Sequence, residues 1–187
     1  MSHIPLDVGA LSRCGVRDLS VSLWVESYKQ KLVEMERMQF TTRIDAPVSS
    51  VHALMIGRET FKQWTSVFNP SSEYESDVEG SWQKGSKIRF MGTDADGKRG
   101  GMVGYIRENI PGKHVSIEYV GIVDGENEIT EGPVADEWKG FENYTFSDNN
   151  GATHVTVDID VNDQMKDYFH DRYPRALAKL KEICEQR

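Results

Sequence analysis

The sequence predicts an α+β fold in which one curved antiparallel sheet grips a long helix near the end of the chain. Three observations carry this prediction. A strand pattern followed by a helix pattern covers residues 38–55, several segments with alternating apolar residues come next, and a long apolar stripe at helical spacing covers 165–184. A sheet with one face closed by a helix leaves a space between the two layers, and small molecules bind in such spaces.

The first predicted elements are a strand and two short helices. Apolar and polar residues alternate over 38–46, as in a strand with one buried face. Pro47 ends this strand and suits the first position of a helix, because its φ angle is already helical. Apolar residues at helical spacing follow it, and residues 58–64 form a second short helical pattern.

About six antiparallel strands are predicted after these helices. Alternation is visible over 88–90, 102–106, 115–123 and 142–146, and it is clearest over 155–161. Turn dipeptides separate the segments, namely Asp-Gly at 96–97, Pro-Gly at 111–112 and Asn-Gly at 150–151. Hairpins are therefore the expected connections.

The final element is a long amphipathic helix. Asn162 or Asp163 is suited to cap it, and Pro174 is expected to start or kink its main segment. The apolar stripe along this helix consists of Tyr168, Phe169, Tyr173, Leu177, Leu180 and Cys184.

The chain of 187 residues is expected to hold one domain, residues 38–187, preceded by an extension, residues 1–37. Pro5, Gly9 and Gly15 interrupt the extension early, and apolar residues at roughly helical spacing follow. The extension is interpreted either as a docking segment or as a loosely held terminus. A third possibility is that translation starts at Met35 or Met38.

Charge and cysteine content exclude several classes of partner. The net charge of −8, with Lys and Arg scattered, disfavours binding to nucleic acid or to anionic membranes. Cys14 and Cys184 form no disulfide framework and no metal motif. Residues 1–17 carry neither a signal-peptide core nor a membrane span, so we expect a cytoplasmic protein without membrane insertion.

No motif for metal, nucleotide or serine chemistry is present. His52, His114, His154 and His170 are dispersed, so no metal site and no cofactor are predicted. His170, beside Asp171, is interpreted as a partly exposed helix residue, with a general base as the alternative. We assign no catalytic residue.

Five stretches together resemble the helix-grip superfamily, also called SRPBCC, which includes START lipid-transfer domains, birch-pollen-allergen-like proteins and polyketide cyclases. They are Ile-Asp-Ala-Pro-Val at 44–48 with Val51, Glu-Gly-Ser-Trp-Gln-Lys-Gly at 79–85, Ile-Pro-Gly-Lys at 110–113, Glu-Asn-Tyr-Thr-Phe at 142–146 and Tyr-Pro-Arg-Ala-Leu at 173–177. Within the superfamily they look most like a bacterial branch related to the carboxyl-terminal domain of the activator of the heat-shock protein 90 ATPase. The resemblance spans residue 38 to the end of the chain and carries no catalytic set.

Glu142 is the most informative polar residue, because it shares alternation parity with Tyr144 and Phe146 on the side expected to face the helix. Burial there would raise its pKa and make it a polar anchor for a ligand or an acid for catalysis. The alternatives are that it pairs with a nearby Arg or Tyr, or that a bulge turns it outward.

Aromatic residues from separate elements are expected to converge on the space between sheet and helix. They either fill a core or, as the resemblance implies, line a cavity. The predicted cavity residues are Trp64, Phe90, Ile106, Ile117, Tyr119, Glu142, Tyr144, Tyr173 and Leu177.

Three functions are consistent with these residues. The first is non-catalytic binding of a small hydrophobic or amphipathic molecule, with Glu142 as the polar contact. The second, implied by the resemblance, is a chaperone-associated stress-response module. The third is a cyclase or dehydratase that uses Glu142 with Tyr144 or Tyr119 as acid and base. The ligand and the oligomeric state stay open.

Overall fold

The computed structural model describes residues 35–68, 77–93 and 96–186, which belong to one compact unit. The first elements are strand β1 (Met35–Ile44), helix α2 (Val48–Ile56), helix α3 (Arg58–Thr65) and the short 3-10 helix η2 (Ser66–Phe68). The predicted order of one strand and two short helices is confirmed. β1 begins at Met35 rather than Met38, because residues 35–37 also pair with the last strand. Residues 1–34 of the predicted extension lie outside the described residues.

Seven further strands follow among the described residues, and all pair antiparallel. They are β2 (Asp77–Gly80), β3 (Lys87–Thr93), β4 (Arg99–Ile110), β5 (His114–Asp124), β6 (Asn127–Ile129), β7 (Gly140–Asn149) and β8 (Ala152–Asn162). The sheet order is β1-β8-β7-β5-β4-β3-β2, with β6 paired to β5. The three-residue β6 was not predicted, since it is too short to show alternation.

The turn signals of the sequence lie where the chain reverses. Gly97, Gly112 and Asn150 all have positive φ angles, at 81°, 69° and 55°. Glycine and asparagine adopt this left-handed region most readily, so these hairpin predictions are confirmed. Register shifts between Val103 and Gly104 and between Ile106 and Glu108 interrupt the β4–β5 pairing. Bulges of this kind bend a sheet, which contributes to its curvature.

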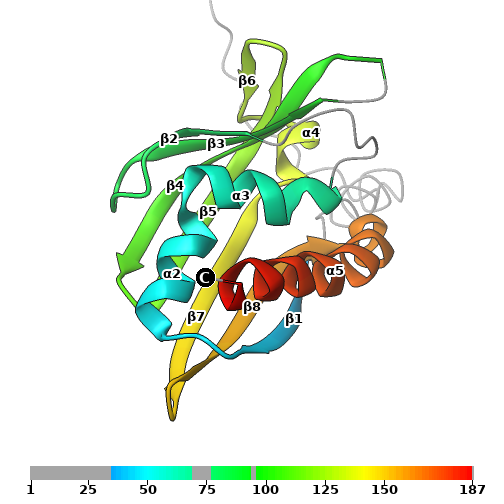
Figure 1. Cartoon of the computed structure of the whole chain (residues 1–187). Helices are drawn as coiled ribbons and strands as arrows, with labels where there is room; N and C mark the ends of the chain where they lie inside the picture. The colour runs from blue at the N-terminus through cyan, green and yellow to red at the C-terminus, as the bar shows by residue number, and fades with distance from the viewer. Residues whose placement is uncertain (1–34, 69–76, 94–95, 187) are drawn as a thin grey trace, which may run out of the picture. The chain divides into compact units, whose positions relative to one another are not determined.

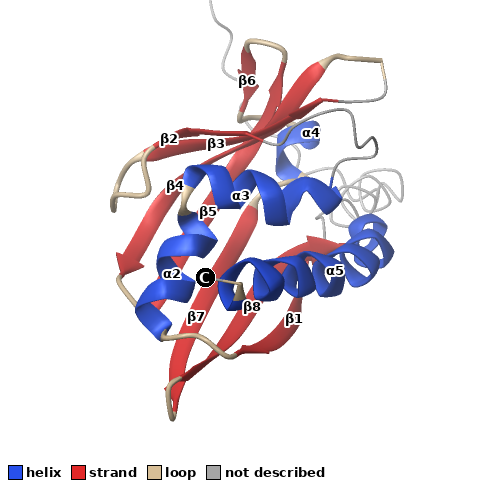
Figure 2. Ribbon diagram, viewed as in Figure 1, coloured by secondary structure: helices blue, strands red, loops and turns tan. Residues whose placement is uncertain are grey.

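The final helix, α5 (Lys166–Glu185), lies on the same face of the sheet as α2 and α3 (Figures 1 and 2). The side chain of Asn162 accepts a hydrogen bond from the Met165 amide at 3.1 Å, as predicted for a cap, at the short 3-10 turn η3 (Asp163–Met165). Pro174 lies inside α5 and does not start it. The result is the α+β helix-grip fold that the sequence predicted. A short helix α4 (Pro133–Asp136) precedes β7.

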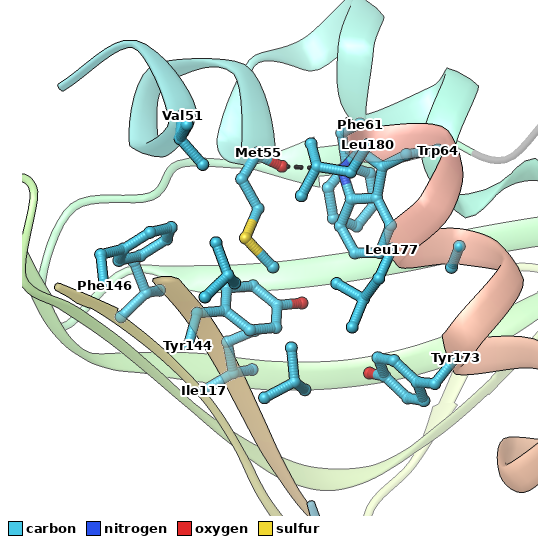
Figure 3. Packing of buried hydrophobic residues seen from close by; sticks show 14 of the residues in the cluster. Val51, Met55, Phe61, Trp64, Ile117, Tyr144, Phe146, Tyr173, Leu177 and Leu180 are labelled. Carbon is cyan, nitrogen blue, oxygen red and sulfur yellow. Dashed lines mark hydrogen bonds between the residues drawn. The ribbon is translucent and has the colours of Figure 1, made fainter. Parts of the chain in front are cut away.

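The main core lies between the sheet and these helices (Figure 3). Val51 and Met55 from α2 and Leu177 and Leu180 from α5 pack over the inward side chains of the central strands. The Trp64 indole Nε1 donates to the Met55 carbonyl at 3.0 Å, which ties α3 to α2. This core fixes the positions of the helices relative to the sheet.

Gly101→Ala is expected to destabilise the protein by about 1–3 kcal/mol, the usual cost of overpacking. A methyl group at Gly101 would lie 2.0 Å from the Phe90 carbonyl oxygen, and this backbone atom is held by β3–β4 pairing. Gly100→Ala is the milder control, because its closest contact would be 3.2 Å. Urea denaturation of both variants checks the prediction. Equal stability of the two variants would contradict it.

Candidate functional site

A cavity of about 410 Å³ lies between one end of the sheet and the helices α3 and α5. Its lining comes from elements far apart in the sequence, and half of the lining side chains are aromatic. The aromatic residues are Phe61, Trp64, Phe68, Phe90, Tyr119, Trp138, Tyr144, Tyr168, Phe169 and Tyr173. The size falls within the range of pockets that hold small molecules.

The buried carboxylate of Glu142 is the polar centre of this cavity. Its Oε2 accepts a hydrogen bond from the Tyr119 hydroxyl at 2.5 Å, and its Oε1 accepts one from the Tyr144 hydroxyl at 2.8 Å. The Tyr173 hydroxyl, from α5, also donates to Oε1. All four side chains are buried. We call these four residues the Glu142 cluster.

Sheet register and helix placement bring the cluster together. Glu142 on β7 pairs with Ile117 on β5, which puts Tyr119 at the diagonal position on the same face. Tyr144 follows Glu142 by two residues along β7 and therefore shares its face. Figure 3 shows the Tyr144 and Tyr173 hydroxyls directed into the space between sheet and helix. The cluster thus joins the sheet to α5.

Burial controls the electrostatics of the cluster. Desolvation raises the pKa of Glu142 above its ordinary value of 4.5, although the three tyrosine hydroxyls favour the charged form and oppose the rise. Burial also raises the pKa values of Tyr119, Tyr144 and Tyr173 well above 10, and the neighbouring Glu142 charge adds to this shift. The tyrosines therefore stay protonated donors at any ordinary pH.

Six of the nine predicted residues line the cavity, and three do not. Those that do are Trp64, Phe90, Tyr119, Glu142, Tyr144 and Tyr173. Ile106, Ile117 and Leu177 are not among the lining residues; they are almost fully buried in the packed core, which corrects that part of the prediction. Ile106, Ile117 and Leu177 do lie on the predicted side of their elements, between sheet and helix. They differ from the six lining residues in their position along those elements.

Position along the strands decides which core residues also border the cavity. Met102, Tyr119, Glu142 and Ile159 line the cavity, and Tyr119 and Ile159 belong to the core as well. Ile106 and Ile117, at other positions along these strands, belong to the core alone. The helix α5 divides in the same way. Its first half contributes Tyr168, Phe169 and Tyr173 to the lining, with Tyr173 also part of the core, and its second half contributes Leu177 and Leu180 to the core alone.

Several lining residues were not predicted as site residues. Phe169 belongs to the predicted apolar stripe of the final helix, and Phe61 lies within the predicted helix at 58–64. Helical spacing does not show which of these residues border a cavity. Phe68 and Trp138 lie in a 3-10 helix and a turn, where no periodic pattern exists. Only tertiary structure could place these four rings.

Three further observations on the described residues concern metal ligation, His170 and membrane spans. No three His, Cys, Asp or Glu side chains among the described residues are grouped as a metal site would require. His170 is exposed on α5, in agreement with its interpretation as an exposed helix residue. In the same described ranges, no helix combines the length and apolar character needed to cross a membrane.

Tyr173→Phe is expected to lower the free energy of unfolding by about 1.5–3 kcal/mol, the usual worth of a hydrogen bond to a charged group. The change removes one donor from Glu142 and leaves the ring in place. Tyr105→Phe is the control, because Tyr105 does not line the cavity and should change stability by less than about 0.5 kcal/mol. Chemical denaturation of both variants measures the difference. Equal effects would show that the cluster contributes no particular stability.

Comparison with known proteins finds solved structures of the same fold. No family model matches the chain, and no curated protein matches it. Among solved structures, protein NE0264 from Nitrosomonas europaea is similar with a TM-score of 0.61 and 18% identity, covering 80% of this chain and 94% of that one. A protein from Arthrobacter aurescens gives a TM-score of 0.62 at 13% identity, covering 83% and 93%.

CalU16 from Micromonospora echinospora is also similar, with a TM-score of 0.57 and 16% identity over 80% of this chain and 74% of that one. These proteins share the fold. At such identities the likeness concerns the backbone arrangement alone. The function therefore has to be argued from the cavity and its residues.

Proposed function

We propose that the protein binds a small amphipathic molecule in this cavity and performs no covalent chemistry on it. The apolar body of the ligand would lie against the aromatic walls, and its polar group would contact the Glu142 cluster. The observation that carries the proposal is a buried carboxylate, held by three tyrosine hydroxyls, that faces a cavity of which half the lining residues are aromatic.

The size of the cavity supports a binding role over a purely structural one. The pocket opens to solvent on one side and has a volume of about 410 Å³, which lies within the range of sites that hold small molecules. Its wall is largely apolar, and a few polar groups, Glu142 among them, reach it, as is usual for such sites. The resemblance to the helix-grip superfamily, which includes lipid carriers, favours the same reading by analogy.

Filling the cavity tests the proposal. Ile159 lines it, on β8 directly opposite Glu142, so Ile159→Phe would place a larger side chain inside. We expect compounds from a lipophilic library to raise the melting temperature of the wild type but not of this variant. Ile110→Phe makes the same change at an exposed strand position and should respond like the wild type. A library without effect on the wild type would count against binding.

A second candidate is acid–base catalysis of the cyclase or dehydratase type. It is favoured by the raised pKa of Glu142 beside the Tyr119 hydroxyl, since a protonated carboxyl can donate a proton to a bound substrate. Glu142→Gln would abolish turnover of any substrate that is found. Unchanged turnover in that variant would remove this assignment. The chaperone-associated alternative stays a prediction, tested by chaperone ATP turnover with and without the protein.

A further inference from the structure

We infer that the cavity selects organic cations, in which a protonated amine is attached to a compact apolar body. The inference rests on the proposed function and names the ligand class for the same cavity. Its basis is the imbalance between acidic and basic groups around the cavity and the direction in which the lining hydroxyls donate.

The cavity lining carries acidic side chains but no basic one among the described residues. The acidic residues are Glu142 and Asp77, and Lys, Arg and His are absent from this part of the lining. Asp77 is balanced, because Arg58 lies 3.4 Å and Lys62 3.5 Å from its carboxylate oxygens. Glu142 is held by tyrosine hydroxyls alone, which solvate its charge without neutralising it. A cationic ligand would supply the missing counter-charge.

The hydroxyl groups of the lining all donate into the protein. Tyr119, Tyr144 and Tyr173 donate to Glu142, and Tyr168 donates to the Phe68 carbonyl. The Thr65 hydroxyl donates to the Phe61 carbonyl at 2.6 Å. A hydroxyl has one proton to donate, so the four tyrosines offer a ligand only acceptor lone pairs.

This arrangement suits an ammonium group and disfavours an anion. An ammonium group is a donor with no acceptor capacity, so it can meet both the carboxylate and the tyrosine oxygens. The aromatic walls add attraction, since the faces of aromatic rings attract cations. Phe68 forms a T-shaped pair with Tyr173 at 5.1 Å between ring centroids, and Phe90 one with Tyr119 at 5.7 Å, so an aromatic ring lies beside each of these two cluster tyrosines. A carboxylate ligand would meet like charge and no donor from the cluster.

Three probes with one apolar body and different head groups test the inference on the full chain. They are phenylbutylamine, phenylbutanol and phenylbutanoate, with affinities measured by isothermal titration calorimetry near neutral pH. We expect the amine to bind at least about tenfold more tightly than the alcohol, because hydrogen bonds between charged partners are about twice as strong as neutral ones. The carboxylate should bind most weakly.

Two variants connect the preference to Glu142. Glu142→Gln removes the charge and is expected to equalise the affinities of amine and alcohol, whereas Glu142→Asp keeps the charge and the order of affinities. Circular dichroism checks that both variants fold. If either variant does not fold, the order of the three affinities in the wild type alone decides whether the cavity selects cations.

The failures of the two proposals can be told apart. If the alcohol or the carboxylate binds as tightly as the amine, the selection of cations is overturned while ligand binding stands. An amine preference that survives Glu142→Gln overturns the assigned role of that carboxylate. If none of the three probes binds, this inference is overturned; if the lipophilic library is also without effect, the proposed function falls with it.

Discussion

Replacing Trp64 with alanine is expected to lower the free energy of unfolding by about 3–5 kcal/mol, the usual cost of truncating a buried aromatic ring. The Trp64 side chain is 1% exposed and borders both core and cavity. Its ring lies edge-on to Phe61 at 5.3 Å and to Tyr144 at 6.4 Å. Its removal would therefore loosen the contact of α3 with the sheet as well as the hydrogen bond to α2.

Urea denaturation followed by circular dichroism measures this loss. Trp64→Phe is the matched control, because it keeps an aromatic ring and loses the indole donor to Met55, which is worth about 1 kcal/mol. A loss below about 1 kcal/mol for Trp64→Ala would contradict the assignment of this ring to the core.

Stability is expected to fall as the pH rises through the titration range of Glu142. Below 4.5, its ordinary pKa, the carboxyl is protonated in the folded and the unfolded chain alike. Between 4.5 and the raised pKa of the folded state, the unfolded chain releases this proton and the folded chain retains it, so increasing pH favours unfolding. The contribution is about 1.4 kcal/mol for each unit by which the pKa is raised.

The difference in unfolding free energy between the wild type and Glu142→Gln isolates this contribution. Asp77, Glu128 and Glu185 have lowered pKa values and act in the opposite direction at acidic pH, but they are present in both proteins and cancel. The tyrosines of the cluster do not titrate in this range. The stability of the wild type relative to the variant should decline with pH. A flat or rising difference would contradict a raised pKa of Glu142.

The fold could be predicted because each local signal agrees with the tertiary arrangement. Buried and less buried residues alternate strictly over 153–161 in β8, and Asn150 and Gly151 supply the positive φ angles of its hairpin. The side chain of Glu142 could be placed for the same reason. The β7–β8 register runs without a bulge from residue 142 to residue 149, so parity assigns Glu142 and Tyr144 to one face.

The cavity itself could be predicted only in part. Alternation along a strand shows which face of the sheet a side chain occupies, but not whether it lies at the end where the cavity is. The sequence therefore could not show that Tyr119 borders the cavity while Ile106 and Ile117 do not. Whether a void exists depends on how far α5 stands from each end of the sheet, which no periodicity encodes. Of the alternatives for Glu142, pairing with tyrosines is the one found, and no bulge in the β7–β8 register turns it outward. Its side chain also lines the cavity, and its role toward a ligand stays a prediction.

Native mass spectrometry of the protein purified from the organism that makes it tests the central claim most directly. We expect the wild type and Ile110→Phe to carry a small molecule that dissociates on activation, and Ile159→Phe to lack it. Identification of the released compound would also give its head group. A wild type that carries no small molecule, or an Ile159→Phe variant that retains the same one, would contradict the claim that this cavity is a binding site.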